Sequence, residues 1–311
     1  MPLVPVRGVV GTPVTPFTPD NRVDQKALEK VVRFLLDSEV AAIALPMHIG
    51  ESLNLDSAER RQVAEVAAAV ISGGVPLIVN VSMAGTDQAI ELTRHAARIG
   101  AAAVIAVTPY HWQPPREALF QHYESLALAA PVGVIAYNYP SRLGVEVSLE
   151  LLEDLIQGVD NFVGLKDAGL SMEYFTEVCR LAAQLRPDFS TYTGVEYLLP
   201  SMIVGGAGAF SALGAVAPRL VRGLHQACAS ADYGLALELQ RRASRLWRLL
   251  QPSYPATVKA AMEILGRPAG ATRRPVPPLS QEARGRLART LGEWGILDSE
   301  PIGWNARVGQ P

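Results

Sequence analysis

The sequence has few cysteines and no excess of charge of either sign. Cys179 and Cys228 are the two cysteines among 311 residues, and no Cys-x-x-Cys spacing is present. Neither a disulfide framework nor a zinc ribbon is therefore indicated, and a reducing cytoplasm is the location that we expect. The formal net charge of -2 gives no basic field that would attract nucleic acid or an anionic membrane. We therefore expect a small-molecule partner and no nucleic acid.

Signals for targeting, membrane insertion and nucleotide binding are also missing. Residues 1–7 have no positive region ahead of an apolar core, so they do not predict a signal peptide. The uncharged windows 66–86 and 197–218 approach the length of a membrane span. Glycine and proline interrupt both windows, which indicates helix ends followed by buried strands. No Gly-x-Gly-x-x-Gly or Gly-Lys-Ser/Thr pattern is present, and we predict no membrane span and no cofactor.

The chain does contain a regular alternation of short apolar runs and amphipathic stretches. The runs predict strands at 8–10, 41–45, 76–81, 103–107, 132–136, 162–165, 189–193 and 209–210. The stretches predict helices at 26–38, 58–71, 87–99, 117–129, 149–156, 172–185, 195–204 and 218–229. Continuous hydrophobicity indicates strands that are buried on both faces, as in a parallel sheet covered by helices. Eight such units without a dinucleotide loop predict an α/β protein with a closed (β/α)8 TIM barrel.

The sequence changes character from about residue 233 onward. Helical patterns at 235–250, 254–265 and 282–294 predict about three appended helices, and residues 267–278 form a proline-rich connection. No linker separates these helices from the barrel. We expect a barrel over residues 1–232 that carries the active site, with a C-terminal α-helical extension over residues 233–311 packed on it as part of a single domain.

A lysine and a tyrosine each stand at the end of an apolar run. Lys166 ends Phe-Val-Gly-Leu-Lys, and Tyr137 ends Gly-Val-Ile-Ala-Tyr, 29 residues earlier. An amine at the mouth of an apolar strand is poorly solvated when charged, so its pKa should fall. Only a neutral lysine attacks a carbonyl to form a Schiff base, and a nearby phenol can shuttle the protons. On spacing alone, a strand-end lysine that reaches into solvent is the more common explanation.

Further segments stand in the order and spacing of one family, at 8–17, 50–51, 108–110, 137–142, 164–167 and 208–211. Over roughly residues 5 to 295 the chain resembles the dihydrodipicolinate synthase and N-acetylneuraminate lyase superfamily, lysine-dependent aldolases that act on 2-oxo acids. The resemblance implies that Lys166 forms the Schiff base and that Tyr137 relays protons. It also implies that Arg142 meets a substrate carboxylate, a task that suits its bidentate fork. A homotetramer is implied in the same way.

Residues just after the strands build the site of such a barrel, because the strands point their carboxyl ends to one face. We expect catalytic roles for His48 and His111 beside Lys166 and Tyr137. Substrate contacts are expected from Ile49, Gly50, Tyr110, Arg142, Gly194, Phe210 and Ser211.

Three of these residues, in two segments of the chain, depart from the family pattern. Where the family usually has two hydroxyl residues before Gly-Glu, this chain has His48 and Ile49, and where the family often has a second tyrosine after Pro-Tyr, it has His111. In the family the first hydroxyl and the second tyrosine complete a proton relay with the strand-end tyrosine. The second tyrosine usually comes from a neighbouring subunit.

Three explanations are open for His48 and His111. Imidazoles titrate near neutrality, so they can act as acid and base in a rewired relay, and a protonated His48 could pair with a carboxylate. The two histidines with Glu51 could instead bind a metal, although no His-x-His spacing is present. They could also be structural, in a pocket with only a binding role. We favour the relay and predict no metal site.

The sequence therefore predicts a lyase, an aldolase or dehydratase that forms a Schiff base between Lys166 and a 2-oxo acid. Ile49 makes the carboxylate end of the pocket less polar, so a longer or more apolar acid than pyruvate is expected. Dihydrodipicolinate synthesis itself is not expected, because the hydroxyl pair is absent. The alternatives are a non-catalytic or regulatory barrel that binds a 2-oxo acid and a metal-dependent lyase.

Overall fold

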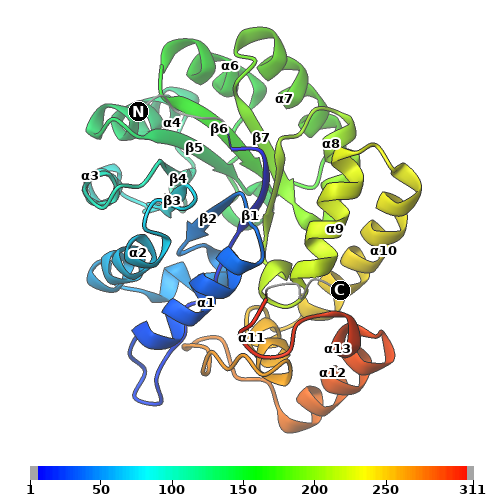
Figure 1. Ribbon diagram of the computed structural model, residues 1–311. Helices are drawn as coiled ribbons and strands as arrows, with labels where there is room; N and C mark the ends of the chain where they lie inside the picture. Colours follow the sequence, from blue (N-terminus) through cyan, green and yellow to red (C-terminus); the bar gives the residue numbers. More distant parts are fainter. Residues whose placement is uncertain (1–5, 307–311) are drawn as a thin grey trace.

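In the computed structural model, which describes residues 6–306, eight parallel strands close into one barrel (Figure 1). The strands are β1 (Gly8–Gly11), β2 (Ala42–Leu45), β3 (Leu77–Asn80), β4 (Ala103–Val107), β5 (Gly133–Asn138), β6 (Phe162–Asp167), β7 (Ser190–Gly194) and β8 (Gly208–Ser211). Each strand pairs with the next, and β8 pairs with β1. The strands are buried almost throughout, as their continuous hydrophobicity predicts. The predicted (β/α)8 fold is confirmed.

A ring of helices surrounds the barrel (Figure 1). It consists of α1 (Gln25–Asp37), α2 (Ser57–Ile71), α3 (Thr86–Arg98), α4 (Arg116–Ala129), α6 (Leu149–Gly158), α7 (Met172–Leu185), α8 (Leu198–Ile203) and α9 (Pro218–Ala229). Asp56 begins α2 with a reciprocal capping box to Glu59, and Ser148 caps α6. These side chains satisfy backbone N–H groups that the first helical turn leaves without partners.

The barrel closes where β1 and β8 come unusually near each other. A Cβ on Gly208 would lie 1.9 Å from the carbonyl oxygen of Gly8, and the φ of Gly208 is +151°. No other residue adopts that conformation and tolerates that contact. Glycine at this position therefore lets the Gly8↔Gly208 register form and close the sheet.

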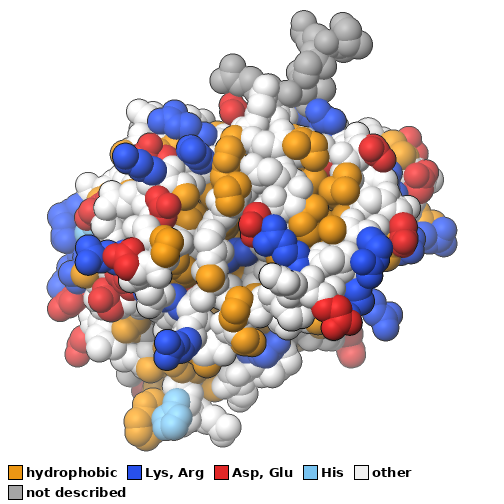
Figure 2. Space-filling model, turned by 90° about the horizontal axis from the view of Figure 1, so that it is seen from below, with side chains coloured by type: hydrophobic (Ala, Val, Ile, Leu, Met, Phe, Trp, Pro, Cys, Tyr) orange, Lys and Arg blue, Asp and Glu red, His pale blue; other side chains and the backbone are white. Residues whose placement is uncertain are grey.

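The C-terminal chain forms α10 (Tyr233–Leu250), α11 (Ala256–Ile264), α12 (Gln281–Glu293) and α13 (Ile296–Ser299). Helix α10 lies beside α9, and α11, α12 and α13 gather at the lower edge of the view in Figure 1. Seen from below, this side shows hydrophobic side chains through its middle and charges of both signs around them (Figure 2). Within residues 6–306, no helix is both long and apolar enough to cross a membrane.

Two details of the helices differ from the sequence prediction. Two short helices, α5 (Pro140–Leu143) and α13, had no signal in the sequence. The helix predicted at 195–204 is a 3₁₀ turn, η3 (Val195–Tyr197), followed by α8. Gln240 of α10 causes this break, because its Oε1 accepts from Leu199 N at 2.8 Å and its Nε2 donates to Glu196 O at 2.9 Å. A side chain from a distant helix therefore caps α8 in place of a longer helical run.

Candidate active site

A cavity of about 110 Å³ lies at the carboxyl ends of the barrel strands. Residues of the barrel and of the C-terminal chain line it: Thr12, Met47, His48, Ile49, Tyr137, Tyr139, Arg142, Lys166, Ala168, Gly194, Glu196, Phe210, Ala212, Trp247, Gln251 and Tyr254. Seven of the residues predicted for the site are in this set, namely His48, Ile49, Tyr137, Arg142, Lys166, Gly194 and Phe210. The cavity is therefore the candidate active site.

Lys166 and Tyr137 face each other inside this cavity. They are register partners on the neighbouring strands β6 and β5, which places them side by side at the same height in the barrel. The Nζ atom of Lys166 lies 4.0 Å from the centroid of the Tyr137 ring and 5.7 Å from that of Tyr139. Both side chains are buried. An amine and a phenol are thus held together away from bulk water.

The surroundings of Lys166 change its acidity. Burial lowers the pKa of the amine to about 8, against the attraction of Glu196 and Asp167, which favours the charged form. The direction is the one expected for an amine at the mouth of an apolar strand. With a pKa near 8, roughly one amine in ten is neutral at pH 7, compared with fewer than one in a thousand for an ordinary lysine. The site therefore supplies a nucleophilic amine at neutral pH.

Tyr137 is a neutral phenol in this environment. Burial raises its pKa above the ordinary tyrosine value, and the charges of Tyr139, Glu196 and Asp167 act in the same direction. Its ring is stacked against Tyr139, with centroids 5.7 Å apart and an angle of 13° between the planes. The packed ring holds the hydroxyl in a fixed place, where it can donate and accept hydrogen bonds.

His48 stands at the mouth of the cavity in the turn η1 (His48–Gly50). Its ring lies flat on Tyr254, with centroids 5.4 Å apart, and meets Tyr139 edge-on at 6.5 Å. Part of the side chain stays exposed, yet burial of the rest lowers the pKa of His48, and the charges of Arg142 and Lys166 lower it further. The ring is therefore neutral near pH 7. It can accept a proton, but it carries no positive charge that would attract a carboxylate.

Arg142 and Ile49 form other parts of the cavity wall. Arg142 belongs to α5, the short helix that follows the strand of Tyr137, and its side chain is exposed. Ile49 is 1% exposed and presents a branched aliphatic group to the cavity. The wall thus combines a cationic rim with an apolar floor, which suits an acid that has an apolar part.

Four predicted residues lie outside the cavity lining. Gly50 O accepts from Thr15 Oγ1 at 2.7 Å, and Ser211 Oγ accepts from Gly214 N at 3.1 Å, so both residues support the loops behind the wall. Tyr110 is half-buried. His111 is exposed and meets Trp112 edge-on at 4.9 Å, and its φ of +82° marks a tight turn. Within one chain, His48 and His111 therefore do not share the pocket.

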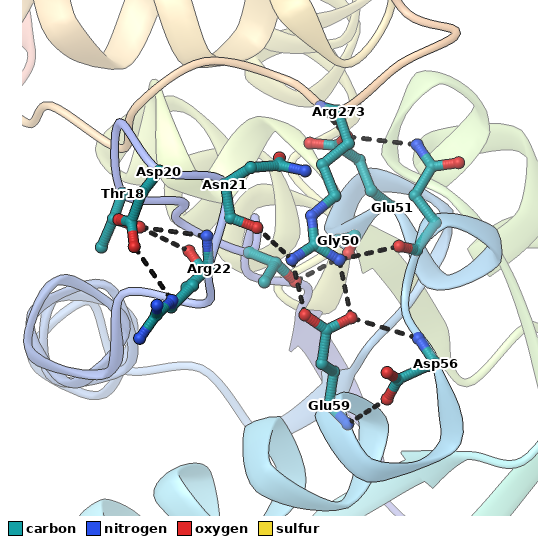
Figure 3. Close-up of polar contacts among 11 residues, drawn as sticks. Thr18, Asp20, Asn21, Arg22, Gly50, Glu51, Asp56, Glu59 and Arg273 are labelled. Carbon is teal, nitrogen blue, oxygen red and sulfur yellow. Dashed lines mark hydrogen bonds and ion pairs between the residues drawn. The ribbon is translucent and has the colours of Figure 1, made fainter.

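Residues of the C-terminal chain bind Glu51 and so stabilise the turn that carries His48 and Ile49. Glu51, with φ of 55°, accepts from Lys259 Nζ at 2.7 Å and from Arg273 N at 2.8 Å. The guanidinium of Arg273 also donates two hydrogen bonds, of 2.5 and 2.6 Å, to the carboxylate of Glu59 (Figure 3). The carboxylate of Glu51 is thus occupied by cationic and amide partners. Among residues 6–306, no group of three or more metal-ligating side chains stands close enough to hold an ion.

Nine residues of the cavity wall are not among the predicted site residues, and the five of them with aromatic or long polar side chains are Tyr139, Glu196, Trp247, Gln251 and Tyr254. Tyr139 and Glu196 each follow a predicted site residue by two positions, so a wider window after each strand would have included them. The other three belong to the C-terminal chain, where a helical pattern is typical of ordinary packing. Nothing in the local sequence distinguishes them.

Known proteins share this architecture over nearly the whole chain. Residues 5–293 match the sequence model of the dihydrodipicolinate synthetase family. A 4-hydroxy-tetrahydrodipicolinate synthase of Methanococcoides burtonii is 32% identical over 292 residues, which are 93% of this chain and 99% of the relative. A probable 2-dehydro-3-deoxy-D-pentonate aldolase of Escherichia coli, YjhH, is 29% identical over 294 residues, 93% and 98% of the two chains.

Solved structures agree with this result. The structure described as the first monomeric dihydrodipicolinate synthase variant aligns with a TM-score of 0.90 at 29% identity, covering 95% of this chain and 99% of that one. YagE of Escherichia coli, in complex with pyruvate, aligns with the same TM-score at 24% identity, covers 93% and 99%, and shows the shared fold alone. The names of the relatives support a lyase. The chain belongs to the dihydrodipicolinate synthetase family.

Proposed function

We propose that this protein is a class I lyase in which Lys166 forms a Schiff base with a 2-oxo acid. The observation that carries the proposal is the buried amine of Lys166, with a pKa of about 8, held 4.0 Å from the ring of Tyr137 in a cavity at the mouth of the barrel. The relatives' names include both a synthase and an aldolase, so the family supports a lyase and leaves the reaction to be proposed.

The chemistry follows from the two side chains. The neutral amine of Lys166 attacks the 2-oxo carbon, and Tyr137 hands over the protons that convert the carbinolamine to an iminium with loss of water. In carbon-carbon cleavage, the iminium then accepts the electron pair of the bond that breaks. In dehydration, it accepts the electron pair of a neighbouring C–H bond, and the resulting enamine expels a hydroxyl group, which leaves as water with the electron pair of the carbon-oxygen bond. Arg142, at the rim, meets a carboxylate of the substrate in a bidentate way. A neutral His48 serves as a proton acceptor at the cavity mouth.

The side chains of the cavity wall limit which 2-oxo acids the site favours. Ile49 gives the pocket an aliphatic surface, and Phe210 and Trp247 add aromatic surface to the same cavity. These groups favour a 2-oxo acid larger than pyruvate and disfavour dihydrodipicolinate synthesis itself. The departures at His48 and Ile49 also favour a second candidate, a barrel that binds a 2-oxo acid without converting it. A metal-dependent lyase has less support, because Lys259 and Arg273 occupy the carboxylate of Glu51.

We also propose that the protein assembles into a homotetramer and that it is located in the cytoplasm. Support for assembly comes from the exposed loop of His111 and Trp112, in which the indole is 75% exposed. Tryptophan is enriched at protein–protein interfaces relative to the rest of the surface. In an assembly, this loop would bring His111 toward a neighbouring chain, since it does not reach the cavity of its own.

Trapping with borohydride tests the proposal directly. The protein is incubated with a panel of 2-oxo acids that begins with pyruvate, reduced with borohydride, and analysed by intact and peptide mass spectrometry. The chain has four lysines, so peptide mapping assigns the adduct. We expect it on Lys166, strongest with the larger acids, absent from Lys166→Ala and unchanged in the exposed control Lys30→Met. Reversible binding without an adduct would support the second candidate, and full turnover by Lys166→Ala would refute the Schiff-base mechanism.

A further inference from the structure

A groove outside the active-site cavity lies between the loop after β1 and the C-terminal chain. Its volume is about 880 Å³, and it shares no lining residue with the cavity. One side comes from the loop of Phe17 to Asn21 and the other from residues 270–274. In Figure 1 these segments, one blue and one orange, lie side by side near the lower edge of the view. Clefts that bind small molecules measure about 300–1,000 Å³, so the groove has room for a small metabolite.

Backbone contacts hold the two sides of this groove together. Phe17 N donates to Ala269 O at 3.3 Å, and a Cβ on Gly270 would lie 2.0 Å from Phe17 O. Because the φ of Gly270 is +70° as well, this close approach requires glycine. Arg273 adds a second link, since its Nη2 donates to Asn21 O at 2.6 Å. The two sides are therefore fixed relative to each other before any ligand binds.

The groove has an excess of positive charge. Its lining, all of which belongs to the described residues, includes Arg273 and Arg274 and no aspartate or glutamate. Arg273 is paired with Glu59 at 2.5 Å. Arg274 is exposed, and no carboxylate within residues 6–306 forms an ion pair with it. A guanidinium without an anionic partner binds a carboxylate or a phosphate through two parallel hydrogen bonds.

Amide side chains accompany this charge. Asn21 lies on the loop after β1, where its side chain is exposed and its amide forms no hydrogen bond with the other residues drawn in Figure 3. Asn54 lines the groove from η2 (Ser52–Asn54) and is half-buried. An amide donates and accepts hydrogen bonds, so it suits a ligand hydroxyl, which also does both. The groove thus combines a free cation with groups that recognise hydroxyls.

The groove is also joined to the turn that supports the active site. Arg273 lines the groove, and its backbone N donates to Glu51 at 2.8 Å. Glu51 directly follows η1, the turn that brings His48 and Ile49 to the cavity. A ligand that contacts residues 272–274 therefore contacts a segment that is hydrogen-bonded to the active-site turn.

We propose that this groove is a second ligand site, which binds a small polyhydroxylated anion and is coupled to the active site. The carboxylate or phosphate of the ligand binds Arg274, and its hydroxyl groups bind Asn21 and Asn54. A ligand that spans both sides of the groove binds best when both sides are in place, which is the arrangement in which Arg273 holds Glu51. Binding in the groove should therefore favour the ordered turn and tighten the cavity for its substrate. The site itself does not depend on the Schiff base proposed for Lys166.

Calorimetry with gluconate and glucose 6-phosphate tests the site, and the tighter of the two identifies the anionic group. We expect one ligand per chain, and neutral glucose should bind at least about 10-fold more weakly. Arg274→Met should weaken binding by about 10-fold or more. Arg33→Met, which removes an exposed guanidinium of α1, should have no effect. Arg142→Met should also retain this binding, since Arg142 belongs to the cavity.

Asn21→Asp provides an independent test of the same contact. Aspartate keeps the size of the side chain and tolerates the φ of 65° at this position. It places a negative charge where the ligand lies, so both anions should bind more weakly while the fold is retained. An unchanged affinity in this variant would show that the ligand lies elsewhere.

Two measurements report on the coupling. NMR signals of the His48 ring should shift when the anion binds to wild type, and they should stay in place in Arg274→Met. The pyruvate concentration that gives half-maximal borohydride adduct should fall about fivefold or more when the anion is present. The first measurement needs no substrate, so it remains valid if Lys166 forms no adduct.

The possible failures can be told apart. A folded wild-type protein that binds neither anion at millimolar concentration would overturn the second site. Binding that survives in Arg274→Met and is lost in Arg142→Met would place the ligand in the cavity and overturn it as well. Binding in the groove without any change in the His48 signals or in the adduct would overturn the coupling. A shift of the His48 signals without any adduct at Lys166 would refute the Schiff base and support the second site.

Discussion

Lys259 Nζ lies 2.7 Å from Glu51 Oε1, and the two side chains are 3% and 1% exposed. This buried ion pair joins α11 to the segment that follows His48 and Ile49. Helix α11 and the barrel turn are far apart in the chain, so the contact makes the C-terminal helices part of the active-site wall. Trp247, Gln251 and Tyr254, which also belong to the C-terminal chain, line the cavity.

Breaking the ion pair should destabilise the protein more than removing it whole. Lys259→Met leaves Glu51 buried without its cation, and such a loss costs about 3–5 kcal/mol in unfolding free energy. The double variant Lys259→Met with Glu51→Gln should recover part of that cost, because no buried charge remains. Urea denaturation of the four proteins in the cycle measures both effects. Single variants that each cost less than about 1 kcal/mol would contradict this account.

Removing the amine of Lys166 should abolish the borohydride adduct and stabilise the fold. Folding lowers the pKa of Lys166 from 10.5 to about 8, so below pH 8 the folded protein holds a poorly solvated charge. Between about pH 8 and 10.5 the unfolded chain binds a proton that the folded chain lacks, and stability rises with pH. Lys166→Met should therefore be more stable than wild type at pH 7 by up to about 3 kcal/mol.

This advantage of Lys166→Met should shrink as pH rises from 8 toward 10.5. Denaturation of both proteins across that range measures the difference, in which the titration of all other groups cancels. Lys30→Met, at an exposed position of α1, serves as the control and should show no such pH dependence. A variant that is less stable than wild type at pH 7 would contradict the burial argument.

Restoring a hydroxyl beside the apolar floor should improve binding of pyruvate. Ile49→Thr adds a hydrogen-bond donor at a buried position of the cavity, and one such bond to a carboxylate is worth about a tenfold change in affinity. The pyruvate concentration that gives half-maximal adduct should fall by that factor, and adding His48→Thr should lower it further. Ile49→Val changes volume without adding a donor and should bind pyruvate as weakly as wild type.

Arg142 should affect both the substrate and its neighbour His48. Arg142→Met removes a bidentate partner for a carboxylate, so KM should rise about 10- to 100-fold. The positive charge of Arg142 contributes to the lowered pKa of His48, so the same variant should raise that pKa. An NMR titration of the His48 ring measures the shift, with Arg33→Met on the exposed side of α1 as the control. A His48 pKa that does not move would place the two groups farther apart.

The exposed loop of His111 provides a test of assembly. If His111 serves the site of a neighbouring chain, activity per chain should fall when the protein is diluted until it is monomeric. His111→Ala should reduce the activity of the assembled protein and have no effect on that of the monomer. Sedimentation and activity assays at matched concentrations measure both quantities. Unchanged specific activity in a verified monomer would show that each chain is complete.

The barrel could be predicted from the sequence because its signals are local. Continuous apolar runs such as 103–107 and amphipathic stretches such as 172–185 each report the surroundings of a single segment. Lys166 and Tyr137 stand out for the same reason, as polar groups that end such runs. The run at 162–165 underestimates β6, which continues through Lys166 to Asp167. These polar residues join the strand because their neighbours across the sheet, Tyr137 and Asn138, pair with them.

The rest of the site depends on contacts between distant segments. Tyr254 becomes a wall residue because it stacks on His48, and Glu196 takes its place because Gln240 of α10 holds its carbonyl oxygen. Such contacts cannot be predicted from a local pattern, because the hydrophobic periodicity of a segment does not depend on which distant residue packs against it. The sequence by itself determined the barrel and the reactive pair. Only the tertiary structure decided which carboxylate, rings and helices surround that pair.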